Sequence, residues 1–141
     1  MTYDFLESEQ ALAEFLDLFE QGTLPKAIWT HAAHLAVGTW YLVTFPEEIT
    51  AIDRVRTGIQ HYNECVGTAN TEDSGYHETL TRVWLILVGA VRRNGTAGDS
   101  SSVLAAPGLA RDAPLRYYSR DRLFSAAARA MFVPPDLAEL P

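Results

Sequence analysis

The chain has little of several features that mark particular classes of protein. It contains a single cysteine, Cys65, so an internal disulfide is excluded, and this composition fits a reducing compartment. No apolar run reaches the roughly 20 residues that a membrane-spanning helix needs. The first residues lack the basic start and apolar core of a signal peptide. We therefore expect a cytoplasmic protein that does not enter a membrane.

Positive charge is also scarce. Eleven Lys and Arg stand against 18 Asp and Glu, which gives a net charge of −7. An acidic chain has no sequence-wide positive field to hold a phosphate backbone, so nucleic acid is not expected as a partner. Glycine-rich phosphate loops are missing as well, because no strand precedes Gly89, Gly95 and Gly98, which lie in or after a predicted helix.

Helical spacing of apolar residues dominates what is present. The length of 141 residues suits one domain around one core. We therefore expect an all-α fold, a single helical bundle-like domain of four to six helices covering residues 1–141. Helices are predicted over residues 7–21, 30–44, 47–66, 75–92 and 119–131, with a break in the last one where Ser125 can cap a second short helix; residues 94–114 are predicted as a long surface loop and 132–141 as an extended tail.

The helix predicted over residues 30–44 carries no charged side chain, and a helix that is apolar nearly all round is a buried one. His31 and His34 are three residues apart, so they project from the same face of this helix, together with Gly38 and Tyr41. A glycine here costs about 1 kcal/mol relative to alanine. We therefore expect Gly38 to provide space, either for a neighbouring backbone or for a ligand.

A third histidine, His77, begins the buried face of the helix predicted over residues 75–92, on which Thr81 and Trp84 follow. The remaining histidine, His61, is two residues from Asn63, which separates them by about 200° around a helix axis. Helical phase therefore predicts that Asn63 faces the interior and His61 faces solvent.

Imidazoles in a buried position are costly to desolvate unless their nitrogens find partners. A single metal ion bound by His31, His34 and His77 would satisfy one nitrogen of each ring and keep a coordination position open for water or substrate. Nitrogen and oxygen donors without thiolate suit Zn, Fe, Ni, Mn or Cu. The alternative is that the histidines form hydrogen bonds within the core and bind no metal.

The neighbours of His77 suggest chemistry at such a site. Glu78 is expected as a fourth ligand or as the general base that acts on a metal-bound water. Its alternative is a surface pair with Arg82, worth a few tenths of a kcal/mol. Tyr76 is expected as a proton donor, or else as a half-buried packing residue. The pocket beside the site is predicted to be lined by Gly38, Tyr41, Asn63, Thr81 and Trp84.

The motifs FEQGTLP at 19–25, WTHAAHL at 29–35 and GYHETLT at 75–81 resemble those of a family of small bacterial proteins without an established activity. Residues 118–129 and 135–137 also fit, so the resemblance covers most of the chain. It implies a bacterial, metal-binding protein. A weaker likeness is to helical-bundle metal hydrolases of the damage-inducible type. It supports the architecture alone, because their histidine spacing differs.

These features together predict a metal-dependent enzyme that acts on a small-molecule substrate, by hydrolysis or by a proton transfer of the lyase or isomerase type. The alternative is a non-catalytic helical module that binds a small molecule or a partner, with its histidines in a core hydrogen-bond network. The sequence leaves the oligomeric state open, a homodimer included.

Overall fold

The computed structural model describes residues 5, 7–93 and 109–141, and every regular element within them is helical. The all-α prediction is therefore confirmed. None of these helices combines the length and apolar character needed to cross a membrane. In chain order the elements are α1 (Glu9–Gln21), the 3₁₀ turn η1 (Lys26–Ile28), α2 (His31–Thr44), α3 (Glu48–Cys65), α4 (Glu78–Arg93), the 3₁₀ turn η3 (Ala113–Arg116), α6 (Arg120–Leu123) and α7 (Ala126–Ala130).

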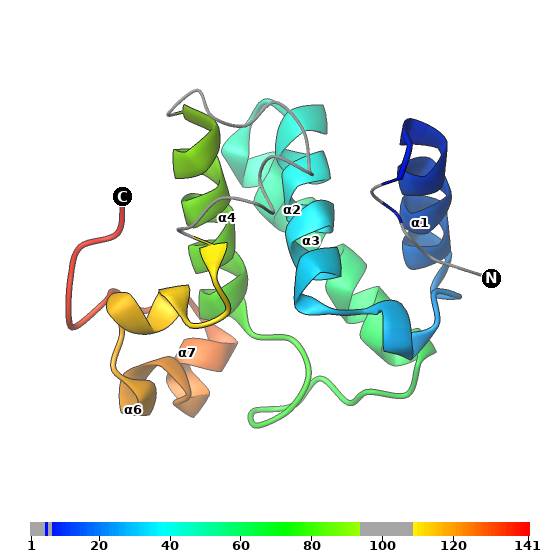
Figure 1. Ribbon diagram of the computed structural model, residues 1–141. Helices are drawn as coiled ribbons and strands as arrows, with labels where there is room; N and C mark the ends of the chain where they lie inside the picture. The colour runs from blue at the N-terminus through cyan, green and yellow to red at the C-terminus, as the bar shows by residue number, and fades with distance from the viewer. Residues whose placement is uncertain (1–4, 6, 94–108) are drawn as a thin grey trace.

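Helix α2 lies in the middle of the molecule. It packs against both α3 and α4, while α1 packs on α3 and the short helix α7 packs on α4 (Figure 1). Helix α1 therefore lies at one side of the fold and α4, α6 and α7 at the other. The central place of α2 follows from its sequence, because a helix without charged side chains gains most by being covered on several faces.

Two apolar clusters hold the helices together. The first joins α1, α2 and α3 around Phe19 and Tyr62, both fully buried. The second joins α2 and α4 to the C-terminal part of the chain around Val83, Tyr118 and Leu123. Full burial of one such side chain is worth about 1.5–3 kcal/mol. The Tyr62 hydroxyl also donates to the Leu24 carbonyl at 2.9 Å, so its polar end is satisfied.

Serine and threonine side chains cap four of the helices at their first turn. Ser8, Thr30, Ser119 and Ser125 each accept a hydrogen bond from the backbone N–H three residues later, at the starts of α1, α2, α6 and α7. The last two caps produce the break that was predicted inside residues 119–131, because Ser125 begins a new helix where α6 has just ended.

The chain beyond α7 crosses back over the second cluster. The Tyr118 hydroxyl donates to the Val133 carbonyl at 2.6 Å, and the Leu137 N–H donates to the Tyr117 carbonyl at 2.9 Å. The predicted loop over residues 94–114 lies outside the described residues except for 109–114. Of these, Ala113 and Pro114 are buried and begin η3.

Candidate functional site

A pocket of about 570 Å³ opens between α2, α3 and α4, with η3 and the end of α6 on its remaining side. Its wall brings together all three histidines of the predicted site, and it also includes Tyr76, Gly38, Asn63, Thr81 and Trp84. The predicted phase of α3 is confirmed, because Asn63 is 6% exposed while His61 lies on the exposed side of the helix.

Tyr41 was predicted in the pocket and does not line it. Its hydroxyl donates to Glu20 Oε1 of α1 at 2.9 Å, and its ring lies against Trp40 and Phe45. Tyr41 follows His34 by two turns, which is about 10 Å along the helix. At that level α1 and α3 cover the face of α2, so the face shared with the histidines no longer opens into the pocket.

The hydrogen bonds of His31 and His34 fix where their protons lie. A carbonyl oxygen only accepts, so the ring nitrogen that contacts one carries hydrogen. His34 Nδ1 lies 2.7 Å from the Thr30 carbonyl, and His31 Nε2 lies 3.1 Å from the Leu109 carbonyl. When the rings are neutral, His34 Nε2 and His31 Nδ1 carry the lone pairs. Within the described part of the chain neither of these two nitrogens has a hydrogen-bond partner.

Two indole rings fix the orientation of these imidazoles. Trp29 lies over the ring of His34 with 3.8 Å between ring centres, and Trp84 meets His31 edge-on at 4.8 Å. His34 is an exposed residue that lines the pocket. Atoms of the pocket wall nevertheless remove part of the water from around its ring. This desolvation lowers the pKa of His34 below its ordinary value of 6.5, which favours the neutral form of the ring.

His77 differs from the other two because both of its ring nitrogens are engaged. Its Nε2–H donates to the Leu123 carbonyl at 2.7 Å, and its Nδ1 accepts from the Leu80 N–H at 3.0 Å. The second bond places His77 as the cap of α4, since Leu80 is the third residue of that helix. Burial lowers the pKa of His77, which keeps it neutral in this role.

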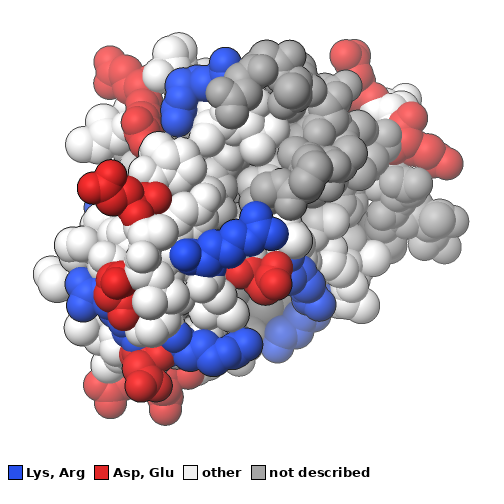
Figure 2. All heavy atoms as spheres, turned by 60° about the vertical axis from the view of Figure 1, so that its left-hand side comes forward, with Lys and Arg blue, Asp and Glu red and all other residues white. Residues whose placement is uncertain are grey.

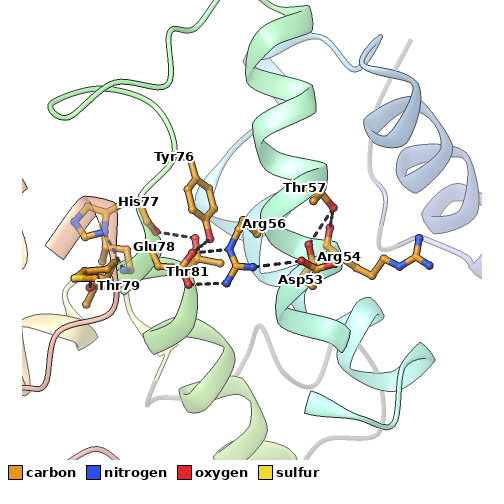
Figure 3. A network of polar contacts seen from close by, with 11 residues as sticks. Asp53, Arg54, Arg56, Thr57, Tyr76, His77, Glu78, Thr79 and Thr81 are labelled. Carbon is orange, nitrogen blue, oxygen red and sulfur yellow. Dashed lines mark hydrogen bonds and ion pairs between the residues drawn. The ribbon is translucent and has the colours of Figure 1, made fainter. Parts of the chain in front are cut away.

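The carboxylate of Glu78 points toward Arg56 and away from the ring of His77 (Figure 3). Its two carboxylate oxygens accept from Nε and Nη2 of Arg56 on α3, each at 2.8 Å, and the Tyr76 hydroxyl donates to Glu78 Oε1 at 2.7 Å. The Arg56 guanidinium holds the pKa of Glu78 below its ordinary value, while burial raises the pKa of Tyr76. The partner of Glu78 is therefore Arg56, not the Arg82 that spacing along the helix suggested.

The hydrogen bonds of His77 and Glu78 compete with the roles predicted for these residues at a metal centre. The described residues contain no group of three or more His, Cys, Asp or Glu side chains that could hold a metal ion. To act as a ligand through Nδ1, His77 would have to give up the hydrogen bond from the Leu80 N–H, and Glu78 would have to leave Arg56. The three-histidine site and the catalytic roles of Glu78 and Tyr76 stay predictions.

A second hollow of about 580 Å³ lies on the other side of Tyr76, which lines both. Its wall contains Arg56, Arg82 and Arg129 together with Glu72 and Glu78, so charges of both signs meet there. The same mixture of signs is visible on the face formed by α4 and the C-terminal part of the chain, where basic and acidic side chains are interspersed (Figure 2).

Some contacts in and around the two hollows were not predicted from the sequence. The contact of the Trp29 ring with His34 is one of them, because helical spacing did not place the two rings together. Arg56 was also missed as the partner of Glu78. It lies four residues after Ile52 and three before Ile59, and therefore beside the apolar face of α3. This spacing could have indicated that its side chain reaches α4. Lys26 and Arg111 also line the pocket, from η1 and from the segment before η3. Lys26 and Arg111 reach the pocket only because segments far apart in the chain meet in the fold, which helical spacing does not predict.

Comparisons with protein-family models, with curated proteins and with solved structures found no match. The resemblance to a bacterial family stays a prediction, and the inference of function rests on the pocket itself.

Proposed function

We propose that the protein binds a small organic molecule in the pocket between α2, α3 and α4. The observation that carries this proposal is that His31 Nδ1 and His34 Nε2, on the wall of an open pocket, have no partner in the described part of the chain. The volume of about 570 Å³ falls within the roughly 300–1,000 Å³ typical of ligand pockets.

The composition of the wall supports such a ligand. Trp29, Trp84 and aliphatic side chains such as Leu85 provide apolar surface, while few polar atoms interrupt it. Thr68 also lines the pocket, and its buried hydroxyl oxygen has no hydrogen-bond partner among the described residues. Neutral His34 can accept a hydrogen bond at Nε2 from a hydroxyl or amide of the ligand. Apolar walls with a few placed polar groups are the usual form of a small-molecule site.

A metal-dependent enzyme is the second candidate. It is favoured by the same two unpaired nitrogens, which belong to residues three apart on α2 and are the imidazole atoms open to a divalent transition metal. Without metal, His34 has the attributes of a general base, because its tautomer is fixed and its ring is neutral. The candidate catalytic group is therefore His34.

Metal analysis of protein purified without a histidine tag separates the two candidates. Near-stoichiometric metal that is lost in a His31→Ala and His34→Ala double variant would favour the metal enzyme. Folded protein that takes up no Zn, Ni, Fe or Cu would leave the pocket as a site for an organic ligand alone.

Binding of the uncharged dye phenylnaphthylamine tests the pocket directly, because its fluorescence rises in apolar surroundings. We expect saturable binding of one dye per chain. Leu80→Trp, which enlarges a half-buried side chain of the pocket wall, should abolish it. Leu137→Trp is the matched control, since Leu137 is 60% exposed and outside the pocket. Equal binding by both variants, or no binding by the unmodified protein, would contradict the proposal.

A further inference from the structure

The charge of the pocket is opposite to that of the whole protein. The chain has 18 acidic residues against 11 basic ones. Among the described residues that line the pocket, however, the permanently charged side chains are Lys26 and Arg111, with neither Asp nor Glu beside them. An anionic group is therefore favoured inside the pocket, although the net charge of the molecule disfavours anions at long range.

These two cations are available to a ligand. Both side chains are exposed, and neither forms an ion pair within the described part of the chain. Glu78, the carboxylate nearest to the pocket along α4, is held by Arg56 and lines the second hollow. In that second hollow Glu72 and Glu78 offset two of the three guanidinium groups. Among the described residues, the first pocket therefore has two cations without a carboxylate beside them, against an excess of one in the second hollow.

The N-terminal ends of two long helices add to the positive potential inside the pocket. The wall includes Thr30 and His31 at the start of α2 and Tyr76 and His77 at the start of α4. The N-terminal end of a helix carries a partial positive charge, which favours an anion within about one turn. The helix ends therefore act in the same direction as Lys26 and Arg111.

On the assumption that the pocket is a ligand site as proposed above, we propose that its ligand is an organic acid. Its apolar, ring-containing body lies beside Trp29 and Trp84, and its carboxylate or similar anionic group is attracted to Lys26 and Arg111. The neutral imidazole of His34 accepts a hydrogen bond from a hydroxyl or amide on the body of the ligand. Both parts of the ligand thus meet groups that the described chain leaves without a partner.

Two dyes that share one ring system separate charge from apolar contact. Anilinonaphthalene sulfonate carries an anionic group, and phenylnaphthylamine has the same rings without it. Substitution of both cations, Lys26→Gln and Arg111→Gln, should weaken binding of the sulfonate by about threefold to tenfold, since exposed charge pairs are each worth up to about 1 kcal/mol. Binding of the uncharged dye should stay within about twofold. Added salt should likewise weaken binding of the sulfonate and leave binding of the uncharged dye unchanged.

The control is a double variant, Arg116→Gln and Arg120→Gln, which removes the same charge from two exposed positions outside the pocket. This control variant should bind both dyes as tightly as the unmodified protein does. If the sulfonate binds equally well to all three proteins while the uncharged dye still binds in the pocket, the organic-acid inference is overturned and the proposed function stands. If neither dye binds the unmodified protein, the proposed function itself fails.

Discussion

At the scale of single residues, three histidines on one pocket wall have different roles because different nitrogens meet backbone groups. His77 uses both ring nitrogens to join the start of α4 to the end of α6, whereas His31 and His34 each use one. A histidine with both nitrogens engaged stabilises the fold, and one with a spare lone pair can act on a ligand. His77 is therefore structural in this conformation.

The structural role of His77 predicts a large effect of its removal on stability. His77→Ala removes a helix cap and leaves the Leu123 carbonyl without its donor, which together should lower the free energy of unfolding by about 2–4 kcal/mol. His77→Asn should lose less, because asparagine is a good capping residue. Urea denaturation measures both values. Equal stability of all three proteins would refute the assigned role.

The ion pair of Glu78 and Arg56 predicts a dependence of stability on pH. The Glu78 side chain is 9% exposed and that of Arg56 is 32% exposed, so Glu78→Gln should lower stability at pH 7 by about 1–3 kcal/mol. The pKa of Glu78 is lowered in the folded protein. The pair therefore contributes fully above the ordinary pKa of 4.5, and this contribution is lost as the pH falls through the lowered value.

Unfolding of the two proteins measured from pH 7 down to about pH 3 tests this sign. The difference in stability should shrink as the pH falls below 4.5. Glu64→Gln on the exposed side of α3 is the control and should change little. A difference that stays constant or grows in acid would show that the carboxylate of Glu78 is not stabilised by Arg56.

At the scale of helices, most of what was predicted correctly about their position and phase followed from local sequence. The uncharged sequence of α2 predicted its central place, and the phase of α3 separated Asn63 from His61. Ser125 predicted the boundary between α6 and α7. These features depend on spacing and on capping, which act over three or four residues. The partner of Glu78 was missed because it lies on another helix, 22 residues earlier in the chain.

The cap of α2 gives a test at this scale. Thr30 Oγ1 accepts from the Ala33 N–H at 3.2 Å, and its carbonyl separately holds His34. Thr30→Ala removes the first bond alone, so we expect a loss of about 1 kcal/mol in the free energy of unfolding, measured by urea denaturation. Thr30→Ser should preserve the stability. Equal stability of the alanine variant and the unmodified protein would contradict the role of Thr30 as a cap.

At the scale of the whole molecule, the pocket lies where the two apolar clusters meet. Helix α2 contributes to both clusters, and its first turn faces the hollow between α3, α4 and the segments on either side of α6. Gly38 lets Leu85 of α4 approach closely, because an added Cβ would lie 3.2 Å from Leu85 Cδ2. The sequence predicted that Gly38 provides space for a neighbouring backbone or for a ligand; the space beside it is taken by the Leu85 side chain, although Gly38 also lines the pocket.

The charge of the pocket is a property of the whole molecule that the sequence does not display. Lys26 and Arg111 are 85 positions apart by their numbers in the chain, yet both line the hollow. Composition described the protein as acidic and therefore gave no reason to expect a basic pocket. Such an arrangement depends on which loops meet after folding, and helical periodicity carries no information about it.

The indole N–H signals of the tryptophans test the central claim, that the pocket is a ligand site, most directly. The chain has three tryptophans, of which Trp29 and Trp84 line the pocket and Trp40 does not. Titration of ¹⁵N-labelled protein with phenylnaphthylamine, with signals assigned from single Trp→Phe variants, should shift the indole signals of Trp29 and Trp84 and leave that of Trp40 in place. Shifts of all three signals alike, or of Trp40 alone, would contradict the account.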